Sequence, residues 1–313
     1  MLGRTANGLF WMYRYLERAE NTSRLIETGQ RIALTRLRTS DEEWRSVMQT
    51  AAVCDGYDLT HDEVTKDSAI DWMLRSKENT SSVMSAITAA RQNARSVRTA
   101  LTSELWEAMN AAYMTTSRRL SRKVPERDLP DLLKALRHST ALVRGMTHGT
   151  MLRNDIYDFS RIGTFLERAD NTARILDVKY YVLLPSLSAV GSSIDNVQWE
   201  TILRSVSGRG GFRMTYGSMP QARDVACYLI LDGRMPRSIA FSTGKIRDNL
   251  EYLSIDYGIQ PPSLELARGL SDACASTSIE EIFHTGLHEY LQTTLFRLSA
   301  LGKQIERDFR FYN

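Results

Sequence analysis

Proline is scarce in this sequence. The 313 residues contain only seven prolines, and the tracts 2–38 and 63–124 contain none. Because proline interrupts helices, these tracts can form long ones, and the residues that fill them favour helix. No sustained alternation of apolar and polar residues requires a sheet. We therefore predict an all-α protein, and the hydrophobic content of 42% is typical of a globular chain.

Cysteine is also rare, and apolar runs are short. The three cysteines, Cys54, Cys227 and Cys274, are far apart, which excludes a disulfide framework or a zinc site built from them. The longest apolar run, YYVLLP at 180–185, is much too short to cross a membrane. The charged N-terminal region lacks the apolar core of a signal peptide. We expect a cytoplasmic protein with reduced thiols and no membrane partner.

The net charge is small. Forty basic side chains stand against thirty-seven acidic ones, for a formal charge of +3, whereas nucleic-acid binding usually needs a strongly basic face. One basic run is concentrated, SRRLSRK at 117–123. We interpret it as a solvated helix end or loop rather than as a phosphate-binding patch, and we expect no nucleic-acid partner.

An internal repeat is the strongest feature of the sequence. YLERAENTSRLIE at 15–27 returns as FLERADNTARILD at 165–177, with seven of thirteen positions identical. Further segments recur in the same order, with Trp44 opposite Trp199 and Ser82 opposite Ser238. The pattern predicts a tandem duplication, with repeats at 1–150 and 151–313, folded as two helical bundles related by a pseudo-two-fold axis and packed into one compact unit.

The repeated segment predicts a polar stripe along one face of each first helix. The stripe residues are Arg14, Glu17, Arg18, Asn21 and Arg24 in the first copy, and Glu167, Arg168, Asn171 and Arg174 in the second. Glu20 and Glu27 point elsewhere on the helix, and we expect them to be solvated. Surface residues drift between duplicated copies, whereas this stripe is kept, so we interpret it as structural or functional.

Two explanations of the stripe are open. In the first, each motif glutamate pairs with an arginine of a neighbouring helix, such as Arg91 or Arg247, and fixes how the halves dock. In the second, the stripes face each other around a pocket, where clustered arginines bind a carboxylate or phosphate group. Glu17 or Glu167 would then orient the arginines or act as a base.

Other segments suggest weaker candidates. Glu281, His284 and His288 would share one face of a single helix and could hold a metal, but we interpret the histidines as ordinary helix residues and expect no metal and no cofactor. The glycine-rich segment 205–217 lacks the ending of a phosphate-binding loop, and we predict a flexible interhelical loop. The recurring serines, Ser82 and Ser238, are predicted to cap helices.

The chain resembles the Alpha-E family. The resemblance rests on GRTANGLFWMYRYLERAENTSRLIE, ARQNARSV with SELW, MPRSI, and the second Glu-Arg segment. It implies a tandem α-helical domain whose Glu-Arg dipeptides fall on Glu17-Arg18 and Glu167-Arg168. One departure is Thr164, which stands where the first copy has Arg14. We therefore expect the site of the second copy to have one cation fewer than that of the first. We do not expect the two halves to function equally.

The resemblance also implies a functional context. Alpha-E proteins are associated by genomic context with circularly permuted ATP-grasp ligases, transglutaminase-like proteins and an NTN-type peptidase. Our preferred hypothesis is an accessory or interaction protein of such a peptide synthesis or modification system, without independent catalysis. The alternatives are an enzyme of acyl or amide transfer that uses the Glu/Arg stripe, and a metal-binding helical bundle. A homo-oligomer is compatible with each of them.

Overall fold

The computed structural model describes residues 1–33, 40–182, 193–217 and 219–312. Within these ranges the protein has fifteen α-helices, two 3₁₀ turns and no β-strand, so the all-α prediction is confirmed. The first half contains α1 (Gly3–Ala33), α2 (Ser40–Thr50), α3 (Cys54–Asp58), α4 (Lys66–Leu74), α5 (Val83–Ser96), η1 (Arg98–Ala100), α6 (Ser103–Arg119), η2 (Glu126–Asp128) and α7 (Leu129–Thr150). The second half contains α8 (Asp155–Val182), α9 (Ser193–Ser205), α10 (Arg209–Tyr216), α11 (Ala222–Ile230), α12 (Ile239–Tyr257), α13 (Pro262–Ser276), α14 (Ile279–Thr285) and α15 (Leu287–Asp308). None of the described helices combines the length and apolar content that a bilayer crossing requires.

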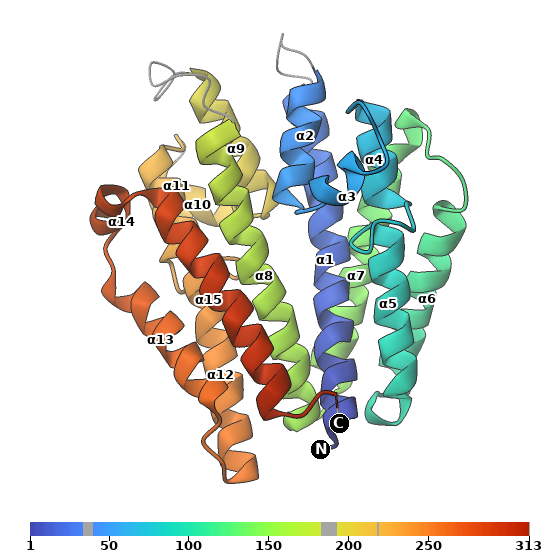
Figure 1. Cartoon of the computed structure of the whole chain (residues 1–313), viewed down its shortest axis with the longest axis vertical. Coiled ribbons are helices and arrows are strands. Elements are labelled where there is room, and N and C mark those ends of the chain that lie inside the picture. The colour runs from blue at the N-terminus through green and yellow to red at the C-terminus, as the bar shows by residue number, and fades with distance from the viewer. Residues whose placement is uncertain (34–39, 183–192, 218, 313) are drawn as a thin grey trace.

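Helices α1 and α8 lie side by side at the centre of the molecule (Figure 1). Helices α5 and α7 pack against α1, whereas α12 and α15 pack against α8. Helix α9 also contacts α1, and α2 contacts α8, so each half reaches across to the other. A tandem duplication would produce this matched order, but the duplication and the division between residues 150 and 151 stay predictions.

Glycine and aromatic side chains shape the contact between α1 and α8. A Cβ atom built on Gly163 of α8 would lie 2.3 Å from the backbone oxygen of Phe10 on α1, so a side chain does not fit there. Phe159 and Phe311 are also buried here, and the ring centroids of Phe10 and Phe311 are 5.4 Å apart. The residues after α15 therefore close one end of the central helix pair, where both chain termini lie (Figure 1).

The predicted helix caps are present, but the prediction of a flexible loop for the glycine-rich segment is wrong. The hydroxyls of Ser82 and Ser238 accept hydrogen bonds from the backbone N–H groups three residues later, at 3.1 Å and 2.9 Å. Residues 209–216 of the glycine-rich segment form α10, which buries Phe212 against Tyr228, with ring centroids 5.6 Å apart. Burial of this aromatic side chain offsets the low helix propensity of the glycines.

Candidate functional site

The two Glu-Arg dipeptides bind each other. Glu17 on α1 accepts two hydrogen bonds from Arg168 on α8, from Nε at 3.0 Å and from Nη2 at 3.0 Å. In the reverse direction, Arg18 donates to Glu167 from Nε at 2.5 Å and from Nη2 at 3.0 Å. Each dipeptide therefore supplies the anion of one bidentate pair and the cation of the other. Bidentate pairs are both strong and directional, so they fix the register of α1 against α8.

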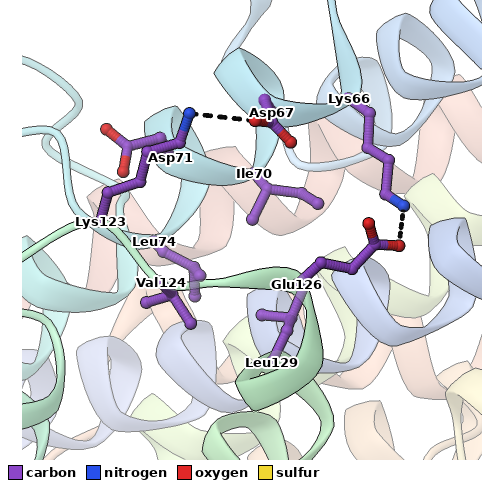
Figure 2. Close-up of a pocket in the computed structure, with 9 residues that line it drawn as sticks. All are labelled: Lys66, Asp67, Ile70, Asp71, Leu74, Lys123, Val124, Glu126 and Leu129. Carbon is purple, nitrogen blue, oxygen red and sulfur yellow. Dashed lines mark hydrogen bonds and ion pairs between the residues drawn. The ribbon is translucent and has the colours of Figure 1, made fainter.

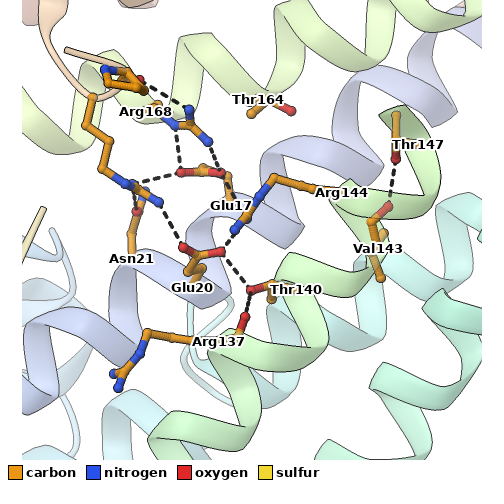
Figure 3. Close-up of polar contacts among 12 residues, drawn as sticks. Glu17, Glu20, Asn21, Arg137, Thr140, Val143, Arg144, Thr147, Thr164 and Arg168 are labelled. Carbon is orange, nitrogen blue, oxygen red and sulfur yellow. Dashed lines mark hydrogen bonds and ion pairs between the residues drawn. The ribbon is translucent and has the colours of Figure 1, made fainter. Parts of the chain in front are cut away.

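Glu20 joins this network and is not solvated as predicted. Its side chain is fully buried and accepts hydrogen bonds from Thr140 at 2.7 Å and from Arg144 of α7 (Figure 3). Arg237, in the turn before α12, lies 2.9 Å from Glu17 and 2.8 Å from Glu20. The arginines that contact the two carboxylates are Arg24, Arg144, Arg168 and Arg237. This excess of cations allows two buried carboxylates to lie close together.

The arginines keep all three carboxylates ionised. Burial by itself raises the pKa of Glu17, but the surrounding arginines, Arg168 foremost, outweigh burial and hold this pKa below its ordinary value. Burial and the charge of Glu17 both act to raise the pKa of Glu20, yet the arginines lower it to about 2. Burial opposes the α1 arginines at Glu167, whose pKa they lower to about 2. Burial also lowers the pKa of Arg237 to about 10, so this side chain is still charged at neutral pH.

Arg14 gives Glu167 a second cation. Its Nε donates to Glu167 at 3.0 Å, and its guanidinium lies 4.7 Å from the ring centroid of Trp11. Thr164, at the equivalent position of α8, donates to a backbone oxygen four residues earlier instead. The expected shortage of a cation at the second carboxylate is therefore wrong, because Arg14 crosses over to supply it. At Glu17, arginines of α7 and of the turn before α12 supply cations in addition to Arg168.

A pocket of about 420 Å³ opens between α1, α8 and α15. Its charged lining residues are Arg14, Arg18, Asp170, Arg174, Lys303 and Glu306. Gly302 of α15 also lines it and lets α15 approach α8 closely, because a Cβ atom built there would lie only 3.1 Å from the side chain of Leu166. On the other side of the α1–α8 pair, Arg144 of α7 reaches into the network. The α1–α8–α15 pocket has the size of a small-ligand site and places the repeated arginines at its wall.

Most of the predicted stripe is found at this contact. The stripe residues in the network or at the pocket are Arg14, Glu17, Arg18, Asn21, Arg24, Glu167, Arg168 and Arg174. Asn21 accepts a hydrogen bond from Arg237 at 3.0 Å. Arg174 pairs with Asp170, one turn earlier on α8, at 2.7 Å. Asn171 is half-buried on the same helix and takes part in none of these pairs.

The expected pairing of Arg91 or Arg247 with the motif glutamates is wrong. Arg91 donates to Asn110 at 2.9 Å and lies over the ring of Tyr113. Arg247 pairs with its neighbour Asp248 at 2.9 Å. Both arginines stand on helices that flank the central pair, but each points to a partner of its own half. The motif glutamates pair instead with the arginines of the opposite motif, and the docking role of these pairs stays a prediction.

The predicted metal residues do not share one helix. Gly286, with φ of 108°, separates α14 from α15, so Glu281 and His284 lie on one helix and His288 on the next. Glu281 accepts a hydrogen bond from the backbone of Ser278 in a capping box, and His288 lies 2.5 Å from Asp177. No group of three or more metal-binding side chains occurs in the part of the chain that the structure describes.

Three charged members of the network were not predicted: Glu20, Arg144 and Arg237. Glu20 stands inside the repeat, and its counterpart Asp170 is also acidic, which was a usable signal. Arg237 lies within the quoted MPRSI segment, directly before a capping serine. Arg144 has no such signal in the sequence, because only the packing of α7 on α1 brings it to the carboxylates.

Comparison with known proteins agrees with this geometry. The Alpha-E family, described as a predicted alpha-helical domain with a conserved ER motif, matches residues 1–309. No curated protein and no solved structure matches the chain significantly. The Glu-Arg dipeptides that bind each other here have the two residues that this description names. Because the match covers nearly all of the sequence, the chain belongs to the Alpha-E family.

Proposed function

We propose that this protein is an accessory component of an ATP-dependent peptide synthesis or modification system and has no catalytic activity of its own. Its partners would be the ATP-grasp ligase and the transglutaminase-like protein that the Alpha-E resemblance implies. The observation that carries the proposal is the arginine-lined α1–α8–α15 pocket. Its size and charge suit a carboxylate or phosphate group presented by a partner or by the substrate of a partner.

The motif carboxylates support binding rather than catalysis. A general base must reach the proton that it removes and needs a pKa near the working pH. Glu17 is 1% exposed and Glu167 is 6% exposed, and arginines hold the pKa of each below its ordinary value against the effect of burial. These carboxylates therefore suit the fixing of α1 against α8 and the orientation of Arg14 and Arg18. We do not assign acyl or amide transfer to them.

The pocket retains cationic donors for a ligand. Arg14 uses Nε and Nη2 for Glu167, which leaves Nη1 for a ligand. Lys303 is exposed and forms no ion pair with any residue that the structure describes. The acidic lining residues Asp170 and Glu306 are each engaged by a neighbouring side chain, at 2.7 Å and 2.8 Å. An incoming anion would thus meet the ammonium group of Lys303 and Nη1 of Arg14, beside carboxylates that already accept hydrogen bonds.

A bulky substitution at the pocket tests the proposal without disturbing the buried pairs. Ser299 is exposed on α15 and lines the pocket, so Ser299→Trp would fill it. Thr293→Trp is the matched control, because Thr293 is exposed on the same helix and does not line the pocket. Each variant is checked for its fold by circular dichroism and used as bait in native lysate, with the captured proteins identified by mass spectrometry.

The wild type and Thr293→Trp are expected to capture an ATP-grasp or transglutaminase-like protein, and Ser299→Trp is expected to lose it. Capture that survives in Ser299→Trp would place the docking surface away from the pocket. If neither class of protein is captured by the wild type, the accessory role is contradicted.

A further inference from the structure

The basic run 117–123 surrounds a second depression, remote from the Glu-Arg network. The depression has a volume of about 360 Å³ and lies between the end of α6, the segment 120–128 and the first turn of α7. Its charged lining residues are Arg118, Arg119, Arg122, Lys123, Asp128 and Asp131. Helix α6 packs against α5 and α7 at the edge of the molecule, away from α8 (Figure 1). The run is largely exposed to solvent, as predicted, and the surface that it forms with its neighbours is concave.

Two ion pairs hold this segment against α4 (Figure 2). Lys123 lies 3.0 Å from Asp67, and Lys66 binds Glu126, so pairs from both ends of the segment reach the same helix. Between them, Val124 packs on apolar side chains of α4 and α7 (Figure 2). The backbone that carries the basic run is therefore positioned before any ligand arrives, which lowers the entropic cost of binding.

Three arginines at the depression lack an anionic partner. Within the described part of the chain, no carboxylate and no side-chain hydrogen-bond acceptor engages the guanidinium groups of Arg118, Arg119 and Arg122. Arg118 and Arg119 stand in the last turn of α6, where positive charge stabilises the helix end. Arg122 lies beyond that turn and gains nothing from the helix dipole. A cluster of unpaired cations costs self-repulsion that a bound anion would remove.

The acidic lining residues only partly offset this charge. Asp128 lies 3.6 Å from Arg127, which is 86% exposed and does not line the depression. Asp131 stands in the first turn of α7, where a carboxylate interacts well with the helix dipole. The depression therefore keeps an excess of positive charge.

We propose that this depression binds the oligophosphate group of a small molecule. Each guanidinium presents a planar fork that binds two oxygens, and a single carboxylate would satisfy only one fork. Three guanidinium groups around one depression therefore suit a ligand that carries several negative charges and presents oxygens on more than one side. Pyrophosphate and triphosphate have this chemistry, either as free anions or as part of a nucleotide. This site is independent of the α1–α8–α15 pocket.

Isothermal titration calorimetry of the whole chain, with pyrophosphate as the probe, tests the proposal. The double variant Arg118→Gln/Arg122→Gln is expected to bind roughly tenfold or more weakly, because two charge-assisted contacts are lost. Asp131→Asn is expected to bind more tightly, because one repulsive charge is removed. Arg95→Gln/Arg213→Gln, which removes the same two charges at exposed arginines outside the depression, is the control and is expected to bind as the wild type does.

The opposite signs of these effects separate binding from folding. If the run had only a structural role, both the arginine and the aspartate variants would bind pyrophosphate more weakly. If the depression binds the anion, the arginine variant loses affinity and the aspartate variant gains it. Absence of pyrophosphate binding at low salt, or an equal loss in the Arg95→Gln/Arg213→Gln control, would overturn the proposal. Titrations with tripolyphosphate and ATP then distinguish the source: equal affinity indicates a site for free oligophosphate, and tighter binding of ATP indicates that the nucleoside also contributes.

Discussion

Replacement of Glu167 by glutamine should reveal how strongly the crossed pairs hold α1 against α8. The substitution keeps the size of the side chain but removes the charge that Arg14 and Arg18 share. Breaking a buried ion pair from one side typically costs about 3–5 kcal/mol, because the remaining charge is left without its partner. The lowered pKa of Glu167 has the same sign, because the two arginines stabilise its ionised form by more than burial destabilises it.

A control on α1 makes this magnitude interpretable. Glu27 also pairs with arginines, Arg31 at 3.3 Å and Arg137 at 2.7 Å, but its side chain is 35% exposed. Partly exposed pairs contribute about 0–1 kcal/mol, so Glu27→Gln should have little effect. Glu17→Gln should cost at least as much as Glu167→Gln, because the arginines around Glu17 are more deeply buried and less easily hydrated.

Urea unfolding followed by far-ultraviolet circular dichroism at neutral pH measures these differences, with the free energy of unfolding obtained by linear extrapolation. A loss of about 3 kcal/mol is a large fraction of a total stability of roughly 5–15 kcal/mol. If Glu167→Gln is no more destabilised than Glu27→Gln, the crossed pairs do not hold the two halves together and the reasoning fails.

Three further results are expected. The motif carboxylates have lowered pKa values, so their stabilisation is complete above about pH 5 and is lost as the pH falls toward 2; a wild-type melting temperature that stays constant over this range would contradict it. Burial and neighbouring aspartates raise the pKa of Asp158 to about 7, so its ionisation destabilises the fold as the pH rises. Asp158→Asn should therefore raise the melting temperature at pH 8 and not at pH 4. Gly163→Ala should destabilise by about 1–3 kcal/mol, because the new methyl group meets the backbone of Phe10. Gly145→Ala, at an open position of α7, should instead stabilise by up to about 1 kcal/mol in the same denaturation assay.

The candidate site was only partly predictable. The repeat indicated that Glu17 and Glu167 matter, because their surroundings are kept between two copies. It did not indicate that each would bind the arginine of the other motif, since sequence periodicity assigns a helix face but not the helix opposite. Arg91 is a candidate partner because it lies on a neighbouring helix, yet its side chain turns toward Asn110. Glu20 was misplaced because a helical wheel of α1 alone does not show that α7 covers that face.

The sequence by itself determined the helical class and the repeated Glu-Arg segments, because helix propensity and side-chain periodicity are local properties of the chain. Only the tertiary structure decided which charges meet. The crossing of α1 and α8 at Gly163 brings two motifs 150 residues apart into reciprocal contact. The same packing buries the first carboxylate beneath α7 and leaves a pocket beside the second, between α1, α8 and α15. Charge pairing depends on distance and on exclusion of water, and both are set by how the helices pack rather than by the order of residues along the chain.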